Sequence, residues 1–292
     1  MRLGLERVCV MLIFDLFDLD DKIEIMDVGA SAIAEVPIYK VLLEKRMALL
    51  TAFDGDARQI TAIENAYGKD FVTVLNYFLF DGGKHDVYLC APASGMSSLF
   101  KPKVEALSFF NGFSKFGEVQ SIENIQTTRL DDIENVKSPD FLKMDVQGAE
   151  LEIIKNGTNK LEDCLAIQLE VSYFNLYEKQ PSFGEVDVYL RELGFIPHMF
   201  LDVKRWSIAP TVFNGNFRVP GNQLLESDVV YVKNPLSLAE LNVIQLKKLA
   251  ILAHYSFKSF DFCVRLLIEL ERREVCDVNS HKQYLLNIKN FD

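Results

Sequence analysis

Asp140–Gly157, with the sequence DFLKMDVQGAELEIIKNG, predicts a buried strand, a tight turn and a helix in succession. The apolar run Phe141–Met144 has the length of a buried strand and ends on Asp145. The helix dipole favours the two glutamates of the first helical turn, and Gly157 is expected to stop the helix in the left-handed conformation. Open α/β sheets build ligand sites at such strand ends, although an ordinary junction with a solvated aspartate fits the same pattern.

The sequence on both sides of this segment alternates between apolar runs and amphipathic stretches. Helices are expected from Pro37, over Asp56–Tyr67, and after Ser182, which forms a capping box with Glu185. Residues 91–119 are loop-rich. The alternation predicts an α/β fold with a doubly wound, mostly parallel sheet. The other expected strands are Ile23–Asp27, Ala48–Phe53, Val72–Phe80, Asp86–Cys90, Leu165–Val171, Phe195–Leu201 and Val229–Val232.

The two ends of the chain depart from this alternation. Residues 1–22 are predicted to form an N-terminal helical segment, whose apolar run Val8–Phe14 is too short to span a bilayer. Residues 23–234 are predicted to form the sheet domain. Residues 235–292 are predicted to be a helical appendage that packs against this domain or joins a homo-oligomer. Its second helix shows the spacing i, i+3, i+4 and i+7 in Cys263, Leu266, Leu267 and Leu270.

Composition excludes some classes of function. A formal charge of −11 argues against sequence-independent nucleic-acid binding, which needs Lys and Arg to neutralise phosphates. The five cysteines are dispersed, without a CxxC pair, so we expect buried thiols in a reducing, cytoplasmic compartment and no zinc site. With 49% hydrophobic residues, the chain can bury a full core.

Three further motifs accompany the run LKMDVQGAE in a fixed order. They are Asp27-Val28-Gly29-Ala30, Leu130-Asp131-Asp132 and Gln168-Leu169-Glu170-Val171. The set resembles the FkbM family of S-adenosylmethionine-dependent methyltransferases, over roughly Ile23 to Val232. The resemblance implies a class I, Rossmann-like methyltransferase fold with S-adenosylmethionine as cofactor.

The turn after the first strand is where the resemblance places the amino-acid end of the cofactor. Gly29 would let the backbone approach, Asp27 would hold the amino-acid end, and Ala30 and Ser31 continue the turn. The later loop glycines of many methyltransferases are missing here, and Ser31 and Ile33 stand in their places. A cofactor loop of altered shape is therefore expected.

Two more strand-end aspartates are candidate cofactor ligands. Asp54 ends the second strand, where the family usually has a carboxylate for the ribose hydroxyls, although Asp54-Gly55 replaces the frequent Glu-Pro. Asp81 follows the third strand, where related enzymes bind adenine. Each could instead simply cap a turn.

Asp145 and Glu170 are the candidate catalytic residues, because they end adjacent strands of the predicted sheet. A hydroxyl acceptor needs a base or a metal that lowers its pKa, and either carboxylate could be the base. Enzymes similar to catechol O-methyltransferase bind Mg²⁺ at comparable strand ends. Val171 follows Glu170 where those enzymes have Asn, so we predict no metal.

Five polar residues are candidate contacts for the acceptor. Ser97 and Ser98 resemble a family element that lines the acceptor pocket, and Gln147 and Glu150 border the Asp145 turn. His198 lies in a predicted strand after Pro197. All five have a structural interpretation as well, as residues that satisfy turns, helix starts or buried hydrogen bonds.

Two hypotheses of different classes follow. The first is an S-adenosylmethionine-dependent methyltransferase that methylates a hydroxyl of a small molecule or glycan. The alternative is a catalytically inactive methyltransferase-like module for binding or assembly, suggested by the altered loop and the helical appendage. A nicotinamide-dependent dehydrogenase is disfavoured because the GxGxxG pattern is missing.

Overall fold

The computed structural model describes most of the chain, and several predictions lie outside that part. These are Ser31, Asp54, all but Ile13 of the apolar run Val8–Phe14, and all but Glu64 of the helix Asp56–Tyr67. The described residues are 13, 16–19, 21–30, 36–53, 64, 68–91 and 94–288. They form two compact units. The larger contains the described residues of 24–30 and 49–234, and the smaller contains the described residues of 13–23, 36–48 and 235–288.

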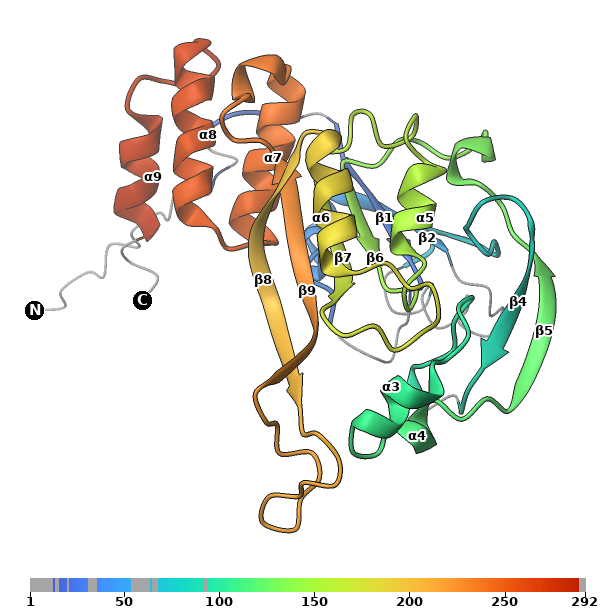
Figure 1. Cartoon of the computed structure of the whole chain (residues 1–292). Coiled ribbons are helices and arrows are strands. Elements are labelled where there is room, and N and C mark those ends of the chain that lie inside the picture. The colour runs from blue at the N-terminus through green and yellow to red at the C-terminus, as the bar shows by residue number, and fades with distance from the viewer. Residues whose placement is uncertain are drawn as a thin grey trace, which may run out of the picture. The chain divides into compact units, whose positions relative to one another are not determined.

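A seven-stranded sheet organises the larger unit (Figure 1). Its strand order is β3-β2-β1-β6-β7-β9-β8. The pairs β2–β3, β1–β6 and β6–β7 are parallel, and β9 is antiparallel to both of its neighbours. The predicted mostly parallel sheet is therefore confirmed. The bounds are β1 Ile23–Val28, β2 Ala48–Phe53, β3 Val72–Leu75, β6 Phe141–Met144, β7 Ala166–Ser172, β8 Phe195–Trp206 and β9 Gln223–Lys233.

Helices α5 (Glu150–Lys155) and α6 (Phe183–Glu192) lie against one face of this sheet (Figure 1). Their buried side chains share one core with the central strands, and each such aliphatic side chain contributes about 1.5–3 kcal/mol. The predicted capping box starts α6, because the backbone N–H of Ser182 donates to the Glu185 carboxylate at 2.8 Å.

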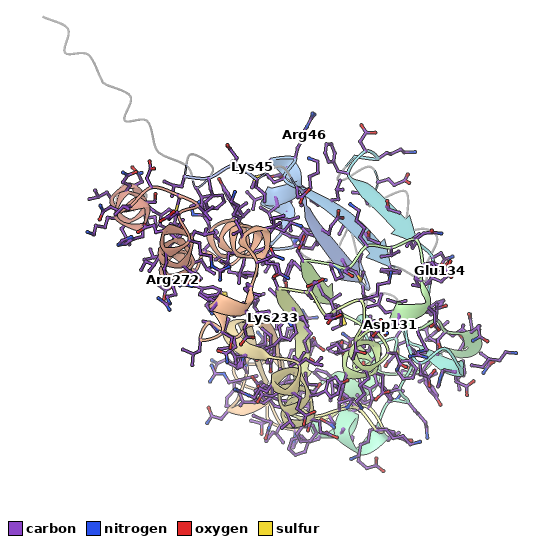
Figure 2. All side chains as sticks on the ribbon, turned by 90° about the horizontal axis from the view of Figure 1, so that it is seen from above. Lys45, Arg46, Asp131, Glu134, Lys233 and Arg272 are labelled. Carbon is purple, nitrogen blue, oxygen red and sulfur yellow. The ribbon has the colours of Figure 1, made fainter. Side chains whose placement is uncertain are left out.

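Position 157, just after α5, requires a glycine for a different reason from the one predicted. It does not adopt the left-handed conformation. A Cβ at this position would instead lie 2.7 Å from the Leu130 side chain, so close packing requires the glycine. The adjacent Asp131, labelled in Figure 2, accepts the backbone N–H of Lys160 at 2.9 Å. Leu130 and Asp131 of the Leu130-Asp131-Asp132 motif thus stabilise the connection between α5 and β7.

The loop-rich residues 91–119 lie between two strands of a smaller substructure. Strands β4 (Lys84–Leu89) and β5 (Ser121–Gln126) form an antiparallel pair. Two short helices that the sequence did not predict, α3 (Val104–Phe109) and α4 (Phe113–Phe116), lie between them in the chain. Helices of this length are stabilised by packing rather than by propensity. Here the Phe113 ring meets the Trp206 ring edge-on, with centroids 5.1 Å apart.

The smaller unit contains α1 (Lys40–Glu44), the 3₁₀ turn η4 (Leu238–Glu240), α7 (Val243–Tyr255), α8 (Phe260–Arg272) and α9 (Ser280–Ile288). The last three helices lie side by side (Figure 1). The predicted apolar face of α8 is confirmed, since Cys263, Leu266, Leu267 and Leu270 are fully buried. In the described part of the chain, no helix combines the length and the apolar character that a membrane crossing requires.

Candidate active site

The turn after β6 has a shape that few residue types tolerate. Gln147 and Gly148 both adopt left-handed backbone conformations, with φ of 53° and 103°. A Cβ on Gly148 would lie 3.1 Å from the Gln180 side chain and 3.3 Å from Phe100. The turn is closed by Glu150, whose carboxylate accepts the backbone N–H of Val146 at 3.0 Å. This geometry presents Asp145 at the carboxyl end of the sheet as an exposed side chain.

Gln147 is the centre of a hydrogen-bond network around Asp145. Its side-chain amide donates to Asp145 Oδ1 at 3.2 Å, and its Oε1 accepts the Tyr177 hydroxyl at 3.1 Å. The Ser98 hydroxyl donates to the Gln147 carbonyl at 2.7 Å. Three predicted site residues, Asp145, Gln147 and Ser98, therefore lie together. Tyr177 joins them without any signal in the local sequence.

Asp27, at the end of β1, is buried and forms an ion pair with the next strand. Lys143 Nζ lies 3.2 Å from Asp27 Oδ1, and the two residues are direct neighbours in the β1–β6 register. Burial alone would lower the pKa of Lys143, but the carboxylates of Asp27 and Asp145 outweigh it, so this pKa is raised. Lys143 therefore stays charged beside Asp27. The pair combines a carboxylate and an ammonium at one strand end.

Gly29 is required by the protein's own backbone. Its φ is +79°, and a Cβ there would lie only 2.1 Å from the Asp145 carbonyl oxygen. The turn is held on both sides, because Gly29 N–H donates to the Phe53 carbonyl and Asp145 N–H donates to the Val28 carbonyl. Gly29 thus brings the β1 and β6 turns into contact, and Ala30 beside it is buried.

Glu170, at the end of β7, shares a cation with Glu226 of β9. Lys204 of β8 lies 3.6 Å from the Glu170 carboxylate and 2.9 Å from that of Glu226. Burial and then the negative charges of Glu226 and Asp145 raise the pKa of Glu170 well above its usual value, and Lys204 offsets this only in part. Glu170 therefore tends to hold a proton. Lys204 and Glu226 escaped the sequence analysis because they lie on a distant hairpin.

Glu150 is a second buried carboxyl group in the same region. Burial raises its pKa to about 7, although backbone N–H groups of the turn, including that of Val146, favour the charged form. The nearby Asp145 carboxylate adds to the rise. Glu150 and Glu170 border one small pocket together with Ser172 and Gln180. Asp145 is thus accompanied by two carboxyl groups that resist ionisation.

The remaining predicted residues near the turn are satisfied within the fold. Ser97 is exposed, and its hydroxyl accepts the backbone N–H of Cys90 at 3.0 Å. Asp81 lies in the turn before β4, where its Oδ1 accepts the Gly83 N–H at 2.8 Å and contacts His85 Nε2 at 2.7 Å. Burial raises the pKa of Asp81, but these contacts outweigh it and the pKa is lowered. Asp81 therefore caps its turn as a charged group.

His198 is not brought to this end of the sheet. It follows Pro197, which pairs with Tyr231 of β9, and Tyr231 in turn pairs with Ile167 near the start of β7. Lys204, six residues later on the same strand, reaches the level of Glu226 and the carboxyl end. Position along the strand, which the sequence pattern did not resolve, separates the two residues.

Within the described residues, no three His, Cys, Asp or Glu side chains are grouped as metal ligands would be. Asp27 and Glu170 are paired with lysines, Glu150 accepts a backbone N–H, and Asp145 accepts the Gln147 amide. Asp54 and Ser31 lie outside the described residues, so their predicted roles are carried only by the sequence.

Comparisons with known proteins bear on the family and the fold of the chain. A family model described as the methyltransferase FkbM domain matches residues 38–197, more than half of the chain. A comparison with curated proteins finds no match.

Among solved structures, a candidate methyltransferase of Thermoplasma acidophilum shows a TM-score of 0.36 and 11% identity over 73% of this chain and 69% of its own. A TehB-like S-adenosylmethionine-dependent methyltransferase of Corynebacterium glutamicum shows a TM-score of 0.33 and 10% identity, over 74% and 83%. A protein of the NADB-Rossmann superfamily from Streptococcus agalactiae shows 0.35 and 12%, over 99% and 98%. These similarities are too low to indicate a shared function.

Proposed function

Because the chain belongs to the FkbM methyltransferase family, whose members depend on S-adenosylmethionine, we propose that it methylates a hydroxyl group of a small molecule or glycan. The observation that carries the proposal is the exposed Asp145 carboxylate at the end of β6, held by Gln147 beside two carboxyl groups with raised pKa values. A hydroxyl is a poor nucleophile until a base removes its proton.

The residues present at the end of β1 fit the cofactor. The amino-acid end of S-adenosylmethionine carries an ammonium and a carboxylate, and Asp27 with Lys143 offers the opposite charge for each. Ala30, Ser31 and Asp54 are proposed to continue this site along the loop and the ribose. For Asp81, Oδ1 makes the contacts described above, and Oδ2 is the atom we propose for adenine. When bound, the cofactor supplies an electrophilic methyl group.

Asp145 is the proposed general base. Its carboxylate is exposed at the carboxyl end of the sheet, and the Gln147 amide fixes the position of Oδ1. The proton of the acceptor hydroxyl passes to this carboxylate. Glu170, which tends to hold its proton, is proposed to donate a hydrogen bond to an acceptor oxygen. The two catalytic candidates therefore take different roles because their surroundings differ.

The proposed acceptor contacts also divide into two groups. Ser97 and Gln147 are exposed or half-buried and can reach a polar ligand. Ser98 and Glu150 are buried and act as positioning residues for the turn. His198 lies too far down β8 to be part of this group.

The proposal is tested in two steps on the full chain. Isothermal titration with S-adenosylhomocysteine measures cofactor binding, and transfer of a labelled methyl group to a panel of methyl glycosides and polyols measures activity. We expect Asp145→Asn to keep the binding but to lower kcat/KM by roughly a hundredfold or more, as the loss of a general base does. Asp70→Asn, at an exposed turn before β3, is the matched control and should change neither.

An unchanged kcat/KM in Asp145→Asn would refute the assigned base. Absence of S-adenosylhomocysteine binding by the natural chain would instead favour the non-catalytic module. Metal independence is a separate proposal, and it requires full activity in the presence of a chelator.

A further inference from the structure

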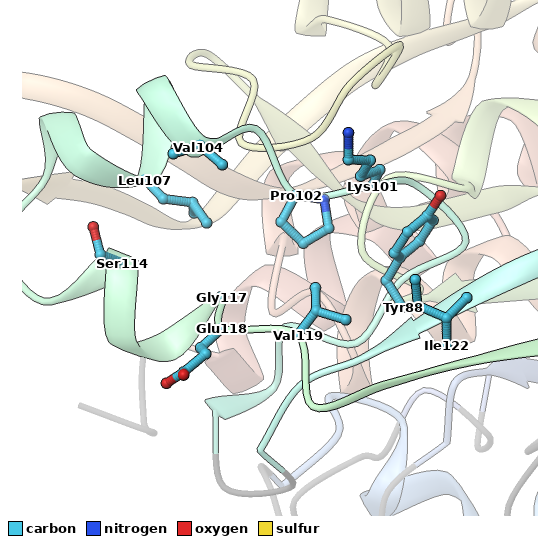
Figure 3. A pocket seen from close by; sticks show the side chains of 10 residues that line it. All are labelled: Tyr88, Lys101, Pro102, Val104, Leu107, Ser114, Gly117, Glu118, Val119 and Ile122. Atoms are coloured by element: carbon cyan, nitrogen blue, oxygen red, sulfur yellow. The ribbon is translucent and has the colours of Figure 1, made fainter.

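A groove lies between helices α3 and α4 on one side and strands β4 and β5 on the other. We call it the α3–β5 groove. Its volume is about 360 Å³, within the range of roughly 300–1,000 Å³ that is common for sites of small ligands. Figure 3 shows apolar side chains, among them Pro102, Leu107 and Val119, across the middle of the groove.

Two apolar side chains that line the groove are largely exposed. Val104 is 72% exposed and Ile122 is 58% exposed, although both line a concave surface. Concave sites that are lined mainly by apolar side chains, with a few polar groups, often bind small ligands. The rim here includes the Tyr88 hydroxyl and the Lys101 ammonium, which point to the same side of the view in Figure 3. Such a surface fits a ligand with an apolar body and a polar end.

Two walls of this groove are joined to the Asp145 turn through Gln147. Tyr88 exchanges two backbone hydrogen bonds with Ser98, whose hydroxyl donates to the Gln147 carbonyl. Pro102 pairs with Tyr177, whose hydroxyl donates to Gln147 Oε1. The Gln147 amide then holds Asp145. A ligand in the groove would therefore contact residues whose neighbours, Ser98 and Tyr177, also hold Gln147 and through it the proposed base.

The charges of the neighbouring site restrict the polar end of that ligand. Asp145, Glu150, Glu170 and Glu226 are all acidic, and Lys204 is already shared between two of them. The exposed Asp145 carboxylate would repel an anionic head group, whereas a neutral polyol or sugar can hydrogen-bond both to this carboxylate and to a protonated Glu170. The chemistry of the site thus favours a neutral, hydroxyl-rich head.

From these observations we propose that the α3–β5 groove binds the alkyl chain of an amphipathic acceptor, such as an alkyl-bearing polyol or glycoside, whose hydroxyl reaches Asp145. This assignment names the acceptor class and rests on the proposed methyl transfer. It places Val104, Val119 and Ile122 as the residues that recognise the chain, because they are the exposed apolar members of the groove.

The test compares two probes that share one sugar, n-octyl β-D-glucopyranoside below its micelle concentration and methyl β-D-glucopyranoside. Isothermal titration with the full chain, in the presence of S-adenosylhomocysteine, should give an octyl Kd roughly tenfold lower or better, because only the octyl chain buries extra methylenes. The variants Val104→Ser and Ile122→Ser should each raise the octyl Kd roughly fivefold. Val188→Ser, on α6 and 58% exposed like Ile122, is the matched control and should leave it unchanged.

Equal Kd values for the two probes would overturn the groove assignment, and so would octyl binding that both groove variants leave intact. A loss shared by Val188→Ser would also overturn it, since it would show non-specific adsorption of the alkyl chain. The binding readout is independent of catalysis. Groove-dependent binding without methyl transfer to the octyl glucoside or to the glycoside and polyol panel would therefore support the groove while overturning the proposed reaction.

Discussion

The turns after β1 and β6 belong to adjacent parallel strands and touch each other, yet they hold their carboxylates in different electrostatic states. At the β1 turn, Asp27 is buried and paired with Lys143 at 3.2 Å. At the β6 turn, Asp145 is exposed, Glu150 is buried with a raised pKa, and the neighbouring Glu170, also with a raised pKa, shares its one lysine with Glu226. At the β1 turn, the charges of Asp27 and Lys143 cancel. At the β6 turn, carboxyl groups outnumber the cations that could pair with them.

This difference suggests a division of labour. A charge-paired, closed turn can bind a ligand that is itself a zwitterion without changing its protonation. A turn with excess carboxyl groups can instead accept or share a proton, because small changes in its surroundings move their pKa values. Gly29 connects the two, since its missing side chain lets the Asp145 carbonyl approach.

The largest expected effect concerns the ion pair of Asp27 and Lys143 at the β1 turn. Lys143→Met leaves the Asp27 carboxylate buried without its partner, and we expect a loss of about 4 kcal/mol in the free energy of unfolding, measured in urea. Lys137→Met is the matched control, since Lys137 pairs with Glu24 but its side chain is 73% exposed, and it should cost about 0.5 kcal/mol or less. A loss in Lys143→Met no larger than in the control would contradict the closed β1 turn.

The next effect concerns the buried acid of the β6 side. The pKa of Glu150 rises from 4.5 to about 7 on folding, so the folded state binds more protons and stability falls as pH rises between these values. Relative to that of Glu150→Gln, the free energy of unfolding of the natural chain should fall by up to about 3 kcal/mol as the pH rises from 4.5 through 7, and should level off once the pH exceeds the folded-state pKa. Urea unfolding at several pH values measures this difference.

The control for this pH experiment is Glu185→Gln in the α6 capping box. The backbone and side chain of Ser182 lower the pKa of Glu185, so its contribution should be lost as pH falls, which is the opposite sign. A pH profile of Glu150→Gln parallel to that of the natural chain would remove the evidence for excess acid at the β6 turn.

A third variant tests the contact between the two turns. Gly29→Ala combines a left-handed φ of +79° with a Cβ only 2.1 Å from the Asp145 carbonyl. Gly194→Ala has almost the same φ, +81°, but open space around the added Cβ. We expect Gly29→Ala to cost about 2 kcal/mol more than Gly194→Ala in urea unfolding, because only the first forces backbone apart. Equal losses of stability in the two variants would show that the left-handed backbone conformation alone explains the need for glycine at position 29.

The smallest expected effect concerns Lys204, the cation beside Glu170 at the end of β7. Lys204→Met removes the cation shared by Glu170 and Glu226, but Glu170 can take up a proton in response. We expect a loss of only about 1 kcal/mol in the free energy of unfolding at pH 8 and a smaller loss at pH 5, because the raised pKa of Glu170 favours its protonated form as the pH falls. Lys204→Arg keeps the charge and should stay near the natural chain at both pH values. A larger loss at pH 5 than at pH 8 would contradict the raised pKa of Glu170.

Local patterns in the sequence were enough to predict the alternation of strands and helices, the mostly parallel sheet, the α6 capping box and the apolar face of α8. They also placed Asp27, Asp145 and Glu170 at strand ends, because apolar runs and the residues that end them are close in the chain. The same patterns missed α3 and α4, whose rings Phe109 and Phe113 pack on Phe174 and Trp206 from distant parts of the chain, and misassigned the role of Gly157.

The tertiary structure alone decided which of these carboxylates are paired, buried or exposed. Lys143 meets Asp27 through strand register, and Lys204 reaches Glu170 from a distant antiparallel hairpin. Tyr177, Gln147 and the α3–β5 groove come together through contacts between segments that are far apart in the sequence. A carboxylate's pKa depends on burial and on charges within a few ångströms, and only the folded chain sets those distances.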